Sequence, residues 1–161
     1  MLPQERTLKG GNTMQKILAI ILFIISFFTT GDMTKANVTL YKDLTAGDTT
    51  AVFVFENNTG KALSQDIKIE TIEKEFLGQW VDVPFSQAVL ETAGKSSFET
   101  RVYPGEKATL HVDFITTVGG IPVQVPLTSG NYRITVSFKT DGYSKVAEGS
   151  VTADFTVAKA A

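Results

Sequence analysis

Hydrophobic and polar residues alternate with a period of two through most of the chain after position 36. In residues 132–139, four hydrophobic side chains at even positions alternate with four polar side chains at odd positions. Successive side chains of a strand point to opposite faces, so this pattern predicts a β-strand with one face buried and one in water. Residues 50–56 are hydrophobic on both faces, which predicts a strand in the middle of a sheet. The simple alternation also marks residues 38–41, 66–70, 110–114 and 151–157.

Short sequences typical of turns separate the predicted strands. They contain Gly, Asn, Pro or Asp, which tolerate a left-handed backbone or preset a turn. After residue 28, hydrophobic residues nowhere recur at helical spacing. Seven or more short strands with this spacing of turns predict an all-β fold, in which two antiparallel sheets pack against each other. The turn sequences are residues 57–60, 77–79, 104–106, 129–131 and 141–142.

Two segments depart from simple alternation. The phase changes near Thr71, because Ile67 and Ile69 have one parity and Ile72 has the other. This change predicts a β-bulge that resets the buried face. Residues 116–130 form the longest stretch without a strand pattern, and we expect irregular structure there. Its two prolines exclude it from the middle of a sheet.

A continuous hydrophobic segment, residues 17–28, follows Lys16 near the N-terminus. A basic stretch, about 7–15 apolar residues and then small residues are typical of a secretory signal peptide. A transmembrane helix needs about 20 apolar residues, so this segment is short for one. We therefore predict an N-terminal signal helix within a signal peptide of residues 1–36, cleaved near Ala36, and a single domain at residues 37–161.

Other interpretations of the N-terminal segment stay open. An uncleaved membrane anchor and a buried core helix are the alternatives to a cleaved signal peptide. Cleavage after Gly31 is an alternative to cleavage after Ala36. Translation can start at Met1 or at Met14.

Composition excludes several classes of function. The chain has 161 residues, a formal net charge of −2, one histidine and no cysteine. This length fits one domain that can bury a core without disulfides. Without cysteine there is no thiolate zinc site and no Cys nucleophile, and one histidine excludes a histidine-cluster metal site. We expect no cofactor, no metal and no nucleic-acid partner, since nucleic-acid binding usually needs a basic face. An exported chain without cysteine favours a bacterial source.

Candidate catalytic groups are few. His111 and Asp113 share one face of a predicted strand, but no Gly-x-Ser-x-Gly elbow supplies a nucleophile, and a solvated strand histidine is the simpler interpretation. Glu70, Glu73 and Glu75 could serve glycoside hydrolysis or calcium binding. They lack the Asp-x-Asp-x-Asp-Gly spacing of a calcium loop, and a solvated strand face explains them. We therefore do not expect an enzyme.

Aromatic and aliphatic residues near turns are the candidate binding residues. Trp80 and Tyr143 each follow a turn, and exposed aromatic side chains at turns suit recognition of sugars or proteins. Packing in the core is the alternative for Trp80, because large aromatic residues are mostly buried. Ile121, Val123 and Val125 would form a contact patch if they face solvent, or close one end of the sandwich if they are buried.

The order of several short motifs resembles a known family. Over roughly residues 37–158 the chain is similar to the bacterial immunoglobulin-like domains of exported proteins. The resemblance implies an immunoglobulin-like antiparallel β-sandwich of about seven to nine strands and supplies no catalytic residues. The loop at 116–126 is longer than the family pattern. The motifs are Val38-Thr39-Leu40-Tyr41, Asn57-Asn58-Thr59-Gly60, a hairpin with Gly78, Trp80, Val83 and Pro84, Tyr103-Pro104-Gly105-Glu106, and residues 110–114 and 127–134.

Two functions from different classes follow as hypotheses. The first is an exported, non-catalytic binding or adhesion module, secreted or associated with the cell envelope, that binds a protein or a glycan through loops or a free sheet edge. It would meet a membrane only through its signal segment. The alternative is a protease inhibitor, because the chain also resembles, more loosely, an immunoglobulin-like proteinase-inhibitor family of bacilli. Those inhibitors are intracellular, whereas residues 17–28 predict export. An inhibitor would present residues 116–128 as an extended, projecting loop, and a packed segment would disfavour it.

Overall fold

The computed structural model describes residues 33–64, 66–92, 101–141 and 146–161. Within these ranges the chain forms eleven strands, and the one helical element is the single 3₁₀ turn η1 (Met33–Lys35). None of the helical structure in this part of the chain has the length and hydrophobicity needed to cross a membrane. The predicted signal helix at residues 17–28 lies outside the described residues. The prediction of an all-β fold is confirmed for the described part.

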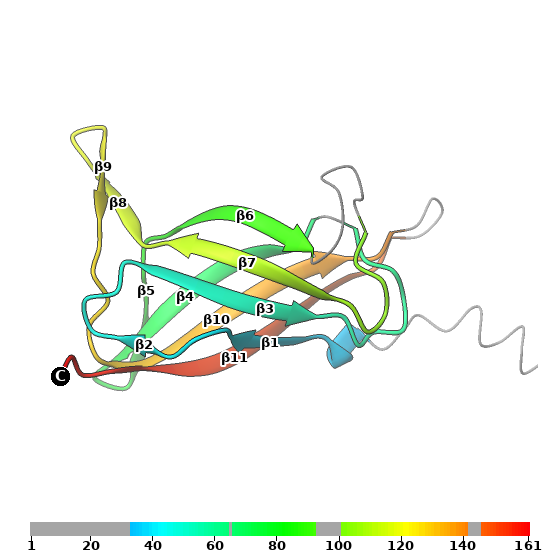
Figure 1. The fold of residues 1–161 in the computed structure, drawn as a ribbon, viewed down its shortest axis with the longest axis horizontal. Coiled ribbons are helices and arrows are strands. Elements are labelled where there is room, and N and C mark those ends of the chain that lie inside the picture. Colours follow the sequence, from blue (N-terminus) through cyan, green and yellow to red (C-terminus); the bar gives the residue numbers. More distant parts are fainter. Residues whose placement is uncertain (1–32, 65, 93–100, 142–145) are drawn as a thin grey trace, which may run out of the picture. The chain divides into compact units, whose positions relative to one another are not determined.

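Two large sheets contain nine of the strands (Figure 1). Neighbouring strands are antiparallel except for one parallel pair, β2 and β11. The first sheet has the order β1 (Asn37–Leu40), β3 (Thr50–Glu56), β7 (Lys107–Asp113), β6 (Ser86–Thr92). The second sheet has the order β2 (Leu44–Thr45), β11 (Glu148–Ala158), β10 (Gly130–Lys139), β4 (Lys68–Phe76), β5 (Gln79–Asp82).

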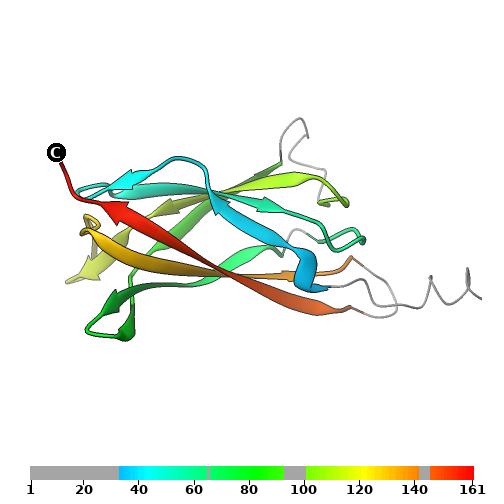
Figure 2. The same ribbon diagram turned by 90° about the horizontal axis from the view of Figure 1, so that it is seen from below.

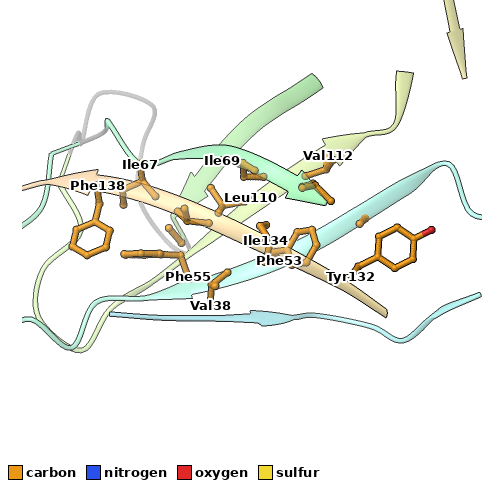
Figure 3. Close-up of a cluster of buried hydrophobic side chains, with 14 of the residues drawn as sticks. Val38, Phe53, Phe55, Ile67, Ile69, Leu110, Val112, Tyr132, Ile134 and Phe138 are labelled. Atoms are coloured by element: carbon orange, nitrogen blue, oxygen red, sulfur yellow. The ribbon is translucent and has the colours of Figure 1, made fainter. Parts of the chain in front are cut away.

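The core lies between the two sheets, which form two layers (Figure 2). Each strand that alternates in sequence turns its hydrophobic positions inward, and Figure 3 shows these side chains between the ribbons. Two aromatic contacts join the layers directly. The ring centroids of Phe53 on β3 and Phe155 on β11 lie 5.3 Å apart, as do those of Phe55 on β3 and Phe138 on β10. Burial of these side chains, at about 25 cal/mol per Å² of apolar surface, is what holds the layers together.

The strand β4 contains the bulge that the sequence predicts. Thr135 of β10 pairs with Thr71, but the next residue, Val136, pairs with Ile69, so Glu70 is the extra residue. The bulge lets Ile69 and Ile72, which have opposite parity, both point into the core, where they are 7% and 1% exposed. The prediction of a central strand at residues 50–56 is also confirmed, since β3 lies between β1 and β7.

Candidate functional site

The stretch that we expected to be irregular forms a hairpin of its own. Among the described residues, the strands β8 (Ile115–Val118) and β9 (Ile121–Gln124) pair only with each other, from Ile115 with Gln124 to Val118 with Ile121. The expectation of irregular structure is therefore wrong for residues 116–124, whereas residues 125–129 lie outside any strand, as expected. The physical reason is local. All four residues of β8 are β-branched, which favours a strand, and both strands of a two-stranded sheet are edge strands, where proline is tolerated.

Two glycines make the turn of this β8–β9 hairpin. Gly119 and Gly120 have φ values of +59° and +83°. A two-residue turn with positive φ at both positions is type I′, whose twist matches the twist of paired strands. A Cβ atom at either position would meet nothing within 4 Å, so backbone conformation and not space selects glycine here.

The base of the hairpin is fixed to the body of the protein. Phe114, immediately before β8, is fully buried, and Leu127, after β9, is 3% exposed. The amide of Val125 donates a hydrogen bond to the carbonyl oxygen of Phe114 at 2.8 Å. The amides of Phe114 and Leu127 donate at 2.8 Å to carbonyl oxygens of Thr49 and Asp48 respectively. The hairpin therefore leaves the body from an ordered support, and Figure 1 shows it projecting from the two sheets.

The projecting part is hydrophobic and carries no charge. Val118, Ile121 and Val123 are 62%, 67% and 44% exposed. No Asp, Glu, Lys or Arg occurs between Asp113 and Arg133. Exposed hydrophobic side chains that cluster in this way, instead of being scattered singly, mark interaction surfaces.

A groove of about 320 Å³ lies beside the base of the hairpin. We call it the base groove. Its walls come from the β4–β5 hairpin, from the segment after β5 and from the segment after β9, which are far apart in sequence. Lys74 and Asp82 are the charged residues that border it. The hydrophobic lining consists mainly of Phe76, Val81, Val83, Pro84, Val125 and Pro126.

Hydrogen bonds hold the wall of the base groove in place. Tyr132 is 1% exposed, and its hydroxyl donates to the carbonyl oxygen of Thr128 at 2.7 Å. The Lys74 ammonium group lies 5.7 Å from the centre of the Tyr132 ring and donates to Thr128 Oγ1. Both contacts fix the segment after β9 against the second sheet, so the groove and the hairpin share one rigid support.

The structure places the predicted binding residues at two different locations. Ile121 and Val123 are on β9 and face solvent, so they do not close the end of the sandwich, whereas Val125, just after β9, is partly buried against the core. Trp80 lies on β5, half-buried on the outer face of the second sheet, and not in the core. The Arg133 guanidinium lies 4.3 Å from the centre of the Trp80 ring, in cation–π geometry. Tyr143 lies outside the described residues.

The glutamates singled out in β4 all contact partners across the sheet. Glu73 accepts two hydrogen bonds from Arg133, at 2.7 and 3.0 Å, and this lowers the pKa of the Glu73 carboxyl and raises that of Arg133. Glu70 accepts from Ser137 at 2.6 Å, which together with Lys68 lowers its pKa. Glu75 accepts from Asn131 at 3.0 Å. Such cross-strand pairs are typical of a solvated sheet face.

The other candidate groups form no recognisable centre in the described residues. His111 and Asp113 lie on the same face of β7, next to the paired strands β3 and β6. In the part of the chain that the structure describes, no three His, Cys, Asp or Glu side chains are grouped to hold a metal ion.

The edge of the second sheet at the first half of β4 is partly covered by a side chain from the first sheet. The first half of β4 extends beyond β5, but Gln87 of β6 reaches across to it from the other sheet. The amide of Ile69 donates to Gln87 Oε1 at 2.7 Å, and Gln87 Nε2 donates to the carbonyl oxygen of Ile67 at 3.3 Å. Because Gln87 occupies backbone groups that a partner strand would need, this edge is a poorer docking site than the β8–β9 hairpin.

Comparison of the chain with protein-family models, curated proteins and solved structures finds no match. A function must therefore be inferred from the arrangement of the hairpin and the base groove. The base groove was missed from the sequence, because alternation does not tell which distant segments meet. The charge-free run between Asp113 and Arg133 was the available signal for the hairpin.

Proposed function

We propose that this protein is an exported, non-catalytic binding module of immunoglobulin-like architecture that contacts a protein partner through its β8–β9 hairpin. The observation that carries the proposal is a hydrogen-bonded hairpin with a hydrophobic, uncharged tip. Val118 and Ile121 are both more than 60% exposed, although the base of the hairpin is buried and hydrogen-bonded. Covering such side chains contributes about 25 cal/mol per Å² of apolar area, and a rigid support reduces the entropy that binding must overcome.

The strand order supports the immunoglobulin-like part of the proposal. An immunoglobulin sandwich has the order A-B-E-D in one sheet and adds strands around C, F and G in the other. The order β1-β3-β7-β6 fits the first pattern, and the order β11-β10-β4-β5 fits G-F-C-C′. The hydrogen bond from Tyr132 to the Thr128 carbonyl, four residues upstream, has the form of the tyrosine corner of such sandwiches.

Export and location rest on the N-terminal sequence alone. Residues 17–28 have the length and composition of a signal-peptide core. Secretion or attachment to the cell envelope is accordingly the location that we propose for the domain, where a partner could be an envelope or an extracellular protein.

Site-specific photo-crosslinking in cells that produce the full chain tests the proposed function. A photoreactive amino acid at position 121 is expected to give a discrete cross-linked product with a protein partner. The matched control places the same amino acid at position 146. Val146 is also exposed (54%), but it precedes β11 and lies at the end of that strand away from the β8–β9 hairpin. Equal products from both positions, or no product from position 121, would contradict the proposal.

A protease inhibitor is the second candidate function, and one observation favours it. Within residues 116–128, the β8–β9 hairpin is extended and projects from the body, as an inhibitory loop must (Figure 1). Inhibition of extracellular serine proteases by the full chain, lost in Ile121→Lys and kept in Val146→Lys, is the result expected for an inhibitor. Slow cleavage at Gly119-Gly120 without inhibition would identify a substrate and contradict this function.

A further inference from the structure

We infer that the partner of the β8–β9 hairpin is a second copy of this chain, whose base groove receives the hairpin tip. The inference rests on the proposed function, because it names the partner of the same hairpin. Each copy would place its hairpin in the groove of the other, so that two identical contacts form around a twofold axis. Such closed, self-complementary pairs are the commonest form of protein oligomer.

The distribution of exposed hydrophobic side chains is the first argument. In the described part of the chain, six of the nine large hydrophobic residues that are exposed belong to the two hairpins at this end. Three of them, Val118, Ile121 and Val123, are on the β8–β9 hairpin. The other three are Phe76 (61% exposed), Leu77 (89%) and Val81 (50%), on the β4–β5 hairpin that forms one wall of the base groove. A partner must cover both groups to bury this surface.

Complementary shape is the second argument. The hairpin is a projection whose exposed hydrophobic side chains are aliphatic. The base groove is a hollow of about 320 Å³, lined mainly by aliphatic side chains and proline. A four-residue strand spans about 13 Å, so two hairpins lying antiparallel would each bring their tip to the base of the other. The segment after β9 joins the hairpin to the groove wall, so every copy of the chain carries both the hairpin and the groove at the same end.

Charge favours a second copy over a lipid surface. The hairpin has no basic residue to attract anionic lipid, and the chain carries a net charge of −2. A bilayer would also cover the tip of the hairpin and leave the groove lining exposed. A second copy instead presents an uncharged tip to a groove whose lining is mostly uncharged, so the tip brings no charge of its own into the contact.

Sedimentation velocity of the full chain over a range of concentrations tests the inference. The expected result is a monomer–dimer equilibrium. Ile121→Lys in the hairpin and Val81→Glu in the groove should each weaken dimerisation about a hundredfold or more, because each places a charge in an apolar contact. The controls are Val146→Lys and Val146→Glu, which put the same charges at an exposed valine remote from both surfaces and should leave the dimer intact.

A mixture of the two variants tests the pairing itself. The Ile121→Lys chain keeps its groove and the Val81→Glu chain keeps its hairpin, so a mixed pair has one intact contact and one Lys–Glu contact. The mixture is therefore expected to dimerise where each variant alone does not. A mixture that stays monomeric, a wild-type chain that is monomeric at every concentration, or a dimer that neither variant weakens would overturn the inference.

Two outcomes separate this inference from the proposed function. If the chain is monomeric but position 121 cross-links to a different protein, the second copy is wrong and the binding function stands. If the monomer floats with phosphatidylglycerol vesicles and Ile121→Lys abolishes flotation, the partner is a membrane, and both the second copy and the protein partner are wrong.

Discussion

The side-chain amide of Asn57 donates a hydrogen bond to the carbonyl oxygen of Val102, 45 residues later in the chain, at 2.8 Å. Asn57 is fully buried at the end of β3, and its amide nitrogen also donates to the carbonyl oxygen of Lys61 at 2.7 Å. Its oxygen accepts from the amide and the hydroxyl of Thr59, at 3.1 and 2.7 Å. One polar side chain thus fixes the loop after β3 to the segment before β7.

Replacement of Asn57 by alanine is expected to lower the free energy of unfolding by about 2–4 kcal/mol, because several buried groups lose their partners together. Denaturation of the full chain with guanidinium chloride measures this loss. Asn58→Ala is the control, since Asn58 is the neighbouring residue of the same type and is exposed. Equal stability of the two variants would contradict the role of Asn57.

Tyr132→Phe removes the hydroxyl that donates to the Thr128 carbonyl and keeps the buried ring. The expected loss is about 1–2 kcal/mol in the free energy of unfolding, the net contribution of a buried hydrogen bond together with an unpaired carbonyl. Tyr41→Phe is the control, because Tyr41 is 74% exposed. A Tyr132→Phe variant as stable as Tyr41→Phe would show that the hydrogen bond from Tyr132 to Thr128 does not fix the groove wall.

The contact between Glu73 and Arg133 predicts a dependence of stability on pH. The hydrogen bonds from Arg133 lower the pKa of Glu73 in the folded state below its value in the unfolded chain. The contact therefore contributes stability above the unfolded pKa, and this contribution is lost as the pH falls through the folded pKa. The difference in unfolding free energy between wild type and Glu73→Gln should thus be largest near neutral pH and shrink in acid.

Unfolding in urea at several pH values measures this difference. Thr135→Ser, on the same sheet face and without a charge, is the control and should give a difference from wild type that does not change with pH. A difference for Glu73→Gln that is constant across the acid range would contradict the assignment.

Gly149→Ala tests close packing at the far end of the sandwich. A Cβ atom on Gly149 would lie 2.9 Å from two carbons of the Phe138 ring and 3.2 Å from Met33 Cβ. Phe138 is fully buried, so the ring must shift, and we expect a loss of about 1–3 kcal/mol in stability. Ser150→Ala, the adjacent exposed position, should have little effect. Thermal unfolding followed by circular dichroism compares the two variants, and equal midpoints would count against the packing.

The sequence was sufficient to predict the strands that face one core. In β10, polar and hydrophobic side chains alternate without interruption, and every residue from Tyr132 to Phe138 lies on the expected face. The bulge at Glu70 was also predictable, because a change of parity between Ile69 and Ile72 has one simple structural solution.

The candidate site was less predictable, for two physical reasons. The β8–β9 hairpin has no core to face, so its residues show no alternation of hydrophobic and polar positions, and its exposed Ile121 resembles a core residue in sequence. The base groove depends on Val81 and Val125 being neighbours in space, which only the pairing of distant strands determines. Trp80 lies on the outer face of the sheet, where Arg133 of β10, separated from β5 by β4, lies against its ring.

The most direct measurement is the backbone order of residues 115–124 in solution, from ¹⁵N relaxation of the full chain. If the hairpin is a preformed contact surface, its amide order parameters should equal those of β10, at about 0.85. Order parameters below about 0.6 across β8 and β9, with β10 still rigid, would contradict a preformed surface.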